Sequence, residues 1–189
     1  MASHTEGYST SASGNFAHAE GNQTNANGLA SHAEGESTIA SNSFTHAEGL
    51  RSQATGIASH AEGFESIASG ENSHAEGRNT TASATASHAE GYYTEASGDY
   101  SHVEGYKTTA SGTASHAGGY IDIVGGINAY GIGSFAHGYT SYGGINAKGY
   151  GAHAEGYATN GTVDASGNGA HAEGYNTKAL AGGAHAEGY

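Results

Sequence analysis

Small side chains recur at every second position within a seven-residue unit along most of the chain. The unit reads x-x-[Ser/Thr]-x-Ala-x-Gly, as in Ser31-His32-Ala33-Glu34-Gly35. Side chains of a strand alternate between its two faces, so Ser/Thr, Ala and Gly of one unit share a face and the intervening residues share the other. A glycine in every unit would cost a helix about 1 kcal/mol relative to alanine, and the apolar spacing follows a period of two. The pattern therefore predicts strands.

Two versions of the unit alternate, so the full repeat is fourteen residues long. One version reads S-H-A-E-G, and the other reads T-x-A-S-G, as in Thr94-Glu95-Ala96-Ser97-Gly98. A three-sided coil needs about eighteen residues, whereas fourteen suit two sides, each with a five-residue strand and a two-residue turn. We therefore predict an all-β parallel β-roll solenoid with fourteen residues per coil, a rise of about 4.8 Å per coil, and Ser/Thr, Ala and Gly facing a narrow interior.

The repeat is disturbed after Gly119, where the most apolar run of the chain, Tyr120-Ile121-Asp122-Ile123-Val124, begins. Further on, Phe135 occupies the usual histidine position and His137 the usual glutamate position. Three regions are expected: a regular β-roll over 1–119, an irregular transition coil over 120–138, and β-roll coils with four-residue turn insertions over 139–189.

The insertions are expected near Tyr139 to Tyr142 and Tyr157 to Asn160, because Gly138, Gly156 and Gly174 lie eighteen residues apart. Insertions in a solenoid map to turns that bulge from one side. Such turns either bind a partner or are merely longer, and the sequence leaves both interpretations open.

The composition limits how the coils can be stabilised. There are 33 glycines and four phenylalanines among 189 residues, and much of the apolar content is alanine and tyrosine. Burying alanine methyl groups yields about 25 cal/mol per Å², whereas ordering each residue costs about 1 to 2 kcal/mol. We therefore expect chains to associate side by side. The expected inter-chain contacts are aromatic or branched residues beside the turns: Phe16, Phe44, Leu50, Tyr92, Tyr100 and Tyr106.

The formal net charge is −13, and the five Lys and Arg residues are scattered singly. Nucleic acid is therefore not an expected partner, because phosphate binding needs clustered basic residues. The absence of cysteine excludes disulfides and thiolate metal sites. No segment reaches the roughly 18 apolar residues of a membrane helix, so we expect no membrane insertion by this segment.

The [S/T]-x-A-x-G pattern with fourteen residues per coil resembles the head repeats of trimeric autotransporter adhesins of the YadA type. The resemblance covers Ser3 to Gly119 and returns at the Ala-His-Ala-Glu-Gly units near the C-terminus. It implies a left-handed parallel β-roll, a homotrimer, and binding to a host surface or matrix ligand. The His-Glu version also looks like repeats in tail appendages of phages and prophages. Together these imply an extracellular location, on a cell surface or a virion.

Histidine and glutamate are expected to form two columns on one face, because their period equals one coil. Each glutamate is expected to accept a hydrogen bond from a histidine of its own chain or of a neighbour, since a column of unpaired buried carboxylates would repel itself. The column residues are His18, Glu20, His32, Glu34, His46, Glu48, His60, Glu62, His74, Glu76, His88, Glu90, His102, Glu104, His153, Glu155, His171, Glu173, His185 and Glu187.

The predicted function is that of a structural or attachment module without catalysis or cofactor. Ser31 and His32 point to opposite faces of their strand, and many copies of one Ser-His-Glu set indicate architecture. The alternatives are a self-assembling head-to-tail filament, a Zn²⁺ or Ni²⁺ site in the His-Glu columns, and ice binding. A calcium roll is disfavoured because its G-G-x-G-x-D repeat is absent.

Overall fold

The computed structural model describes residues 2–189, in two compact units, Met1–Gly91 and Tyr92–Tyr189. The described chain is an all-β parallel solenoid of about 13 turns with about 14 residues per turn, and it contains no helix. The predicted fold class is confirmed at this level.

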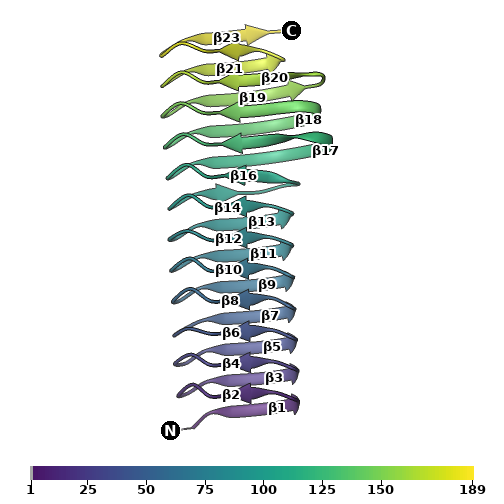
Figure 1. The fold of residues 1–189 in the computed structure, drawn as a ribbon, viewed down its shortest axis with the longest axis vertical. Helices are drawn as coiled ribbons and strands as arrows, with labels where there is room; N and C mark the ends of the chain where they lie inside the picture. The colour runs from purple at the N-terminus through teal and green to yellow at the C-terminus, as the bar shows by residue number, and fades with distance from the viewer. Residues whose placement is uncertain (1) are drawn as a thin grey trace. The chain divides into compact units, whose positions relative to one another are not determined.

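Unit Met1–Gly91 alternates long and short strands along the chain (Figure 1). The long strands are β1 (His4–Tyr8), β3 (His18–Asn22), β5 (His32–Glu36), β7 (His46–Leu50), β9 (His60–Phe64), β11 (His74–Arg78) and β13 (His88–Tyr92). The short strands are β2 (Ser11–Ala12), β4 (Asn25–Ala26), β6 (Ile39–Ala40), β8 (Gln53–Ala54), β10 (Ile67–Ala68) and β12 (Thr81–Ala82).

Each strand pairs in parallel with the equivalent strand of the next coil, in register. His18 pairs with His32, and Glu20 pairs with Glu34. Identical positions of successive coils therefore form columns, as the fourteen-residue period predicts.

The two sides of a coil are unequal, which corrects the expected pair of five-residue strands. A short corner of two residues follows the long strand, and a long corner of five residues, such as 41–45, follows the short strand. One residue in each corner has left-handed backbone, as Ser37 (φ 58°) and Phe44 (φ 62°) do. In the long corner, Oγ of Ser31 donates a hydrogen bond to the carbonyl oxygen of Gly28 at 2.8 Å, and this bond ties the corner to the next long strand.

The interior of this unit is a seam of small side chains. Ala33 on the long strand and Ala40 on the short strand have no exposed surface, and Ser31 and Thr38 beside them are also buried. The expected inward direction of alanine and Ser/Thr is therefore confirmed. Only small side chains fit, because the two sides of the coil lie back to back.

The glycines of the S-H-A-E-G units do not face the seam, contrary to expectation. Gly63 is exposed and has a φ of +102°, a left-handed conformation that favours glycine. A Cβ atom at Gly63 would overlap the carbonyl oxygen of Gly77 in the next coil. Glycine is needed at this position because the backbone of the next coil occupies the space that a Cβ atom would take.

Unit Tyr92–Tyr189 contains coils of unequal width, and β17 and β18 are drawn as its longest arrows (Figure 1). Its strands are β14 (Glu95–Ala96), β15 (His102–Val103), β16 (Thr108–Ala110), β17 (His116–Ala129), β18 (Phe135–Ala147), β19 (His153–Ala158), β20 (Gly161–Ala165), β21 (His171–Tyr175), β22 (Lys178–Ala179) and β23 (His185–Gly188).

The apolar run after Gly119 lies within β17. The four-residue insertions expected in the turns of the next coils instead mainly lengthen strands. β18 runs without a break through Tyr139 to Tyr142, while only Thr159 and Asn160 separate β19 from β20. The register shifts once, between Ile121 and Val124. The irregular coil expected at 120–138 is therefore a wider coil, and its strands remain continuous.

The wider coils have a larger interior. Ile121, Ile127, Ile145 and Val163 are among the largest fully buried side chains of the described chain, and all belong to this unit. Extra strand residues move the two sides apart at one end of the coil, and branched side chains fill the space. These coils bury more apolar area per residue than coils lined by alanine.

We expect Gly63→Ala to lower the free energy of unfolding by about 3 kcal/mol, because the added methyl group overlaps backbone that cannot move independently. The matched control is Gly183→Ala. Gly183 also has positive φ (+66°), but a Cβ atom there meets nothing within 4 Å. The control should cost about 1 kcal/mol, the penalty of left-handed alanine alone. Urea unfolding of both variants tests the difference, and equal losses would contradict the overlap.

Candidate functional site

The histidines of unit Met1–Gly91 form a stacked column on one broad face. From His18 to His88, successive ring centroids lie 4.7–4.8 Å apart, with interplanar angles of 2–5°. The ring of His4, in the first coil, is turned by 69° from that of His18. In-register pairing imposes this spacing, because strand neighbours are separated by the same distance. The column residues here are His18, Glu20, His32, Glu34, His46, Glu48, His60, Glu62, His74, Glu76, His88 and Glu90.

Glutamates lie beside histidines of their own coil, two residues along the same strand. From His18 to His74, Nε2 lies 3.4–3.6 Å from Oε2 of the glutamate. Nε2 of His32, His46 and His60 is buried and makes no well-aligned hydrogen bond. Within this chain the pairing is thus an electrostatic contact between half-buried side chains, weaker than the expected hydrogen bond.

Burial and the neighbouring rings oppose protonation of His32 and His60. Burial lowers the pKa of His60 below its ordinary value, and the neighbouring rings of His46 and His74 lower it further, against the opposing effect of Glu48 and Glu76. Burial also lowers the pKa of His32, followed by the effect of its two neighbouring rings. Protonation of these two rings would place cations one coil from neighbouring imidazoles, so the fold favours their neutral form.

Burial and neighbouring carboxyl groups also shift pKa values in the glutamate column. Burial raises the pKa of Glu62, and its hydrogen bond with Glu76 raises it further. The pKa of Glu76 is lowered, first by its hydrogen bond with Glu90. The two neighbouring carboxyl groups thus have pKa values shifted in opposite directions.

The columns of unit Tyr92–Tyr189 are interrupted. It contains His102, Glu104, His153, Glu155, His171, Glu173, His185 and Glu187 of the predicted set. Gly118 stands in the glutamate column, and Glu104 of the preceding coil contacts Nε2 of His116 at 3.5 Å. Phe135 pairs with His153, and His137 pairs with Glu155, as the sequence alignment predicts. A glutamate can therefore contact the imidazole of its own coil or of the next.

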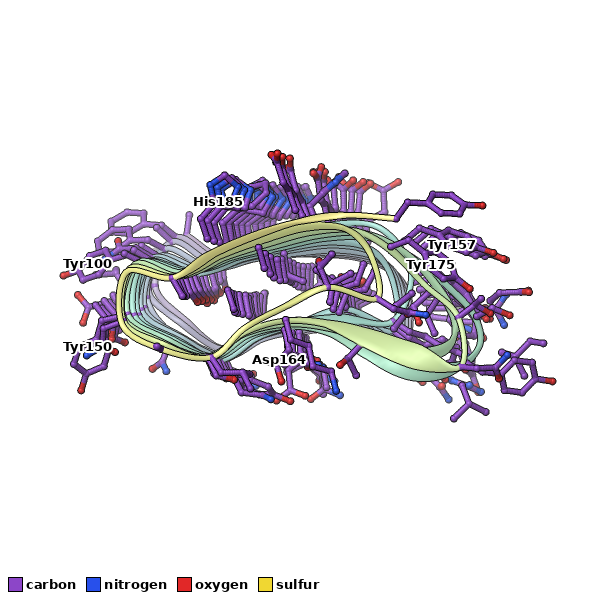
Figure 2. The ribbon with its side chains drawn as sticks, turned by 90° about the horizontal axis from the view of Figure 1, so that it is seen from above. Tyr100, Tyr150, Tyr157, Asp164, Tyr175 and His185 are labelled. Carbon is purple, nitrogen blue, oxygen red and sulfur yellow. The ribbon has the colours of Figure 1, made fainter. Side chains whose placement is uncertain are left out.

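The predicted inter-chain residues lie at the two narrow edges of the coils. Phe16, Phe44 and Tyr100 occupy the long corner and are 60–65% exposed. Leu50 and Tyr92 end long strands next to the short corner, and Tyr106 occupies the equivalent position as a bridge residue between Tyr92 and Tyr120. All three are half-buried. In unit Tyr92–Tyr189, Figure 2 shows Tyr100 and Tyr150 at one narrow edge, Tyr157 and Tyr175 at the other, and His185 and Asp164 on opposite broad faces.

A tyrosine column follows the long strands of unit Tyr92–Tyr189, and most of it was missed from the sequence. Successive ring centroids are 5.0–5.9 Å apart. The signal was the tyrosine that follows glycine at the end of each histidine-containing unit. The column residues are Tyr92, Tyr106, Tyr120, Tyr139, Tyr157, Tyr175 and Tyr189.

Two open grooves share a floor of glycines in the last coils. One, of about 640 Å³, is lined by His137, Glu155, Glu173 and Glu187 and by the glycine that follows each of them. The other, of about 430 Å³, lies on the tyrosine side and is lined by Tyr157, Tyr175 and Tyr189. The glycine column is thus flanked by carboxylates on one side and phenol rings on the other.

Several places in the columns bring metal-ligating atoms together. A histidine, its glutamate and the next histidine have ligand atoms within 4.8 Å of one another at His32–Glu34–His46 and at His153–Glu155–His171, among other positions. The chemistry available to the columns is therefore proton exchange and cation binding.

A scan against protein-family models finds no match, and a search of curated proteins finds no relative. Among residues 2–189, no helix is long and apolar enough to span a membrane.

We expect the melting temperature to fall as the pH is lowered from about 7.5 to about 5.5. The folded pKa values of His32 and His60 lie below the ordinary value. The unfolded chain therefore binds more protons than the folded chain just below that value, and acid favours unfolding. The matched variant is His32→Phe with His60→Phe, because Phe135 already occupies a histidine position of the other unit and packs against His116 and His153. A calorimetric pH series should show a smaller fall for this variant, and an identical fall would exclude the two imidazoles as its source.

Proposed function

We propose that this chain forms a left-handed homotrimeric β-roll that acts as an extracellular structural or attachment module without catalysis. Its place would be a cell surface or a phage tail appendage, and a host-surface or matrix ligand would be its partner. The observation that carries the proposal is the presence of apolar side chains at both narrow edges of the coils.

The two edges suit a cyclic assembly. In unit Met1–Gly91, Phe16, Phe44 and Ile57 are exposed at the long corner, and Leu50 pairs with Phe64 at the other edge. A closed ring of three chains uses two different patches of each chain, one on either side of the interface. Chains that meet edge to edge would satisfy this requirement.

The thin interior gives a reason for association. The seam of unit Met1–Gly91 is made of alanine, serine and threonine, which bury little apolar area per ordered residue. Covering phenylalanines at about 25 cal/mol per Å² would add the apolar burial that the seam lacks.

The serine of the repeat supports a role without catalysis. Oγ of Ser31 is directed to the carbonyl oxygen of Gly28 within the corner, while the ring of His32 lies in the outer column. Ser59 and Ser73 make the same corner bond. These hydroxyl groups stabilise corners, and none of them contacts an imidazole as a nucleophile would.

Native mass measurement tests the assembly, and we expect a mass of three chains. The variant Phe16→Ser with Phe44→Ser should dissociate the trimer or shift it to a concentration-dependent mixture. The matched control, Asn25→Ser with Gln53→Ser, changes outward positions of short strands in the same unit and should leave the mass unchanged. A monomeric native chain, or a trimer lost only in the control, would refute edge-to-edge assembly.

The alternative is a filament formed head to tail through unpaired strand edges. Electron microscopy of the purified chain separates the two, since discrete particles are expected of a trimeric module and indefinite fibres of a filament. Binding to immobilised matrix proteins and bacterial envelopes then tests attachment. Binding that is saturable and weakened by the edge variant is expected, and its absence on every surface would leave only a structural role.

A further inference from the structure

The last coils bring two His-Glu pairs into adjacent positions. His153 pairs with His171, and Glu155 pairs with Glu173, in the register of β19 and β21. Nε2 of His153 lies 3.1 Å from Oε2 of Glu155, and Nε2 of His171 lies 3.3 Å from Oε2 of Glu173. The imidazole nitrogens of the two coils and the carboxylate of Glu155 lie within 4.8 Å of one another.

These distances suit a tetrahedral metal ion. Two ligand atoms at about 2.05 Å from a tetrahedral ion are about 3.3 Å apart. Both His-Glu pairs are already at or just inside this separation. The pairs from His18 to His74 in unit Met1–Gly91 are wider, at 3.4–3.6 Å. The coils of residues 153–175 therefore need less rearrangement within each pair than those coils do.

Ring orientation also distinguishes this position from the coils of His18 to His88. Parallel imidazoles direct their Nε2 lone pairs along parallel lines, which do not meet at one ion. The rings of His153 and His171 are tilted by 25°, with centroids 4.6 Å apart, because Phe135 packs on His153 at 59° and interrupts the coplanar stack. The rings from His18 to His88 differ by at most 5°.

The carboxylates of this cluster border solvent. Glu155 and Glu173 line the groove of about 640 Å³, together with His137 and Glu187. Its floor is glycine, so no side chain covers the approach, and the half-exposed glutamates have room to rotate towards the neighbouring coil. The net charge of −13 raises the local concentration of cations.

We propose that His153, Glu155, His171 and Glu173 bind one divalent transition metal ion of the zinc class. Two imidazoles and two carboxylates supply four ligands, and the carboxylates balance the charge of the ion. The imidazole donors favour Zn²⁺, Co²⁺ or Ni²⁺ over Ca²⁺ and Mg²⁺, which prefer oxygen ligands. In the bound state each imidazole carries its proton on Nδ1, since Nε2 supplies the lone pair. This site is independent of the proposed attachment function.

Calorimetric titration of the full chain with Zn²⁺ tests the site. We expect about one equivalent to bind with the highest affinity, and Glu155→Gln with Glu173→Gln to weaken that binding by more than about tenfold. The matched control, Glu62→Gln with Glu76→Gln, removes adjacent carboxylates of the glutamate column in unit Met1–Gly91 and should retain it. Equal affinity in the wild type and the Glu155/Glu173 variant, or equal loss in both variants, would overturn the assignment.

Cobalt provides a second measurement that reports geometry. Co²⁺ bound by the wild-type chain should give the intense visible absorption of a tetrahedral site, and the Glu155/Glu173 variant should not. Circular dichroism of the metal-free chains verifies that all variants fold. Weak octahedral absorption, unchanged by the Glu155/Glu173 substitutions, would instead indicate scattered binding to single surface histidines and would also overturn the assignment.

Discussion

In-register pairing of successive coils is the constraint on which the other features depend. Each backbone position meets its equivalent one coil away, so every side-chain type is repeated as a column with the spacing of paired strands. A residue type is therefore tolerated at a position only if its side chain can pack against the same side chain in the next coil. Alanine satisfies this requirement inside the seam, and imidazole satisfies it outside, as a stacked ring.

The same constraint gives the two glycine positions different physical roles. Gly28 lies buried in the long corner, where its carbonyl oxygen accepts the hydrogen bond of Ser31. Gly35 lies on the outer face with positive φ, and a side chain there would overlap the backbone of Gly49. A side chain at Gly28 would likewise overlap the backbone of Asn42 in the next coil. Both glycines are therefore required by the close approach of neighbouring coils, and they differ in that Gly28 closes the corner whereas Gly35 also adopts a left-handed backbone.

The period and the alternation were enough to predict the coil length, the parallel pairing and the buried alanines, because these depend only on spacing. The conformation of Gly35 could not be predicted, because alternation assigns a face but no φ angle. The unequal lengths of the two strands in a coil were missed for a related reason. They depend on the long corner, which the hydrogen bond from Ser31 to Gly28 closes, and this bond does not alter the spacing of residue types along the sequence.

The candidate site was predicted in part. Equal spacing placed His153 and Glu155 in columns, and the alignment placed His137 beside Glu155. The sequence pattern did not reveal that Phe135 tilts the ring of His153, because the tilt depends on how two dissimilar rings pack. Most of the tyrosine column was not predicted because its spacing is irregular: Tyr92, Tyr106 and Tyr120 are fourteen residues apart, but the wider coils place Tyr139, Tyr157 and Tyr175 at longer intervals.

The unequal coils of unit Tyr92–Tyr189 have a consequence for how the chain finds its alignment. In a strictly periodic stack, a slip by one whole repeat preserves almost every neighbour, so the misaligned chain competes closely with the native one. The eighteen-residue coils that begin at Phe135 and His153, and the isoleucines buried inside the wide coils, have no equivalent in a fourteen-residue coil. In a slipped chain, Ile145 would lie in a narrower coil without space for its side chain. The wide coils therefore fix the strand register of that unit.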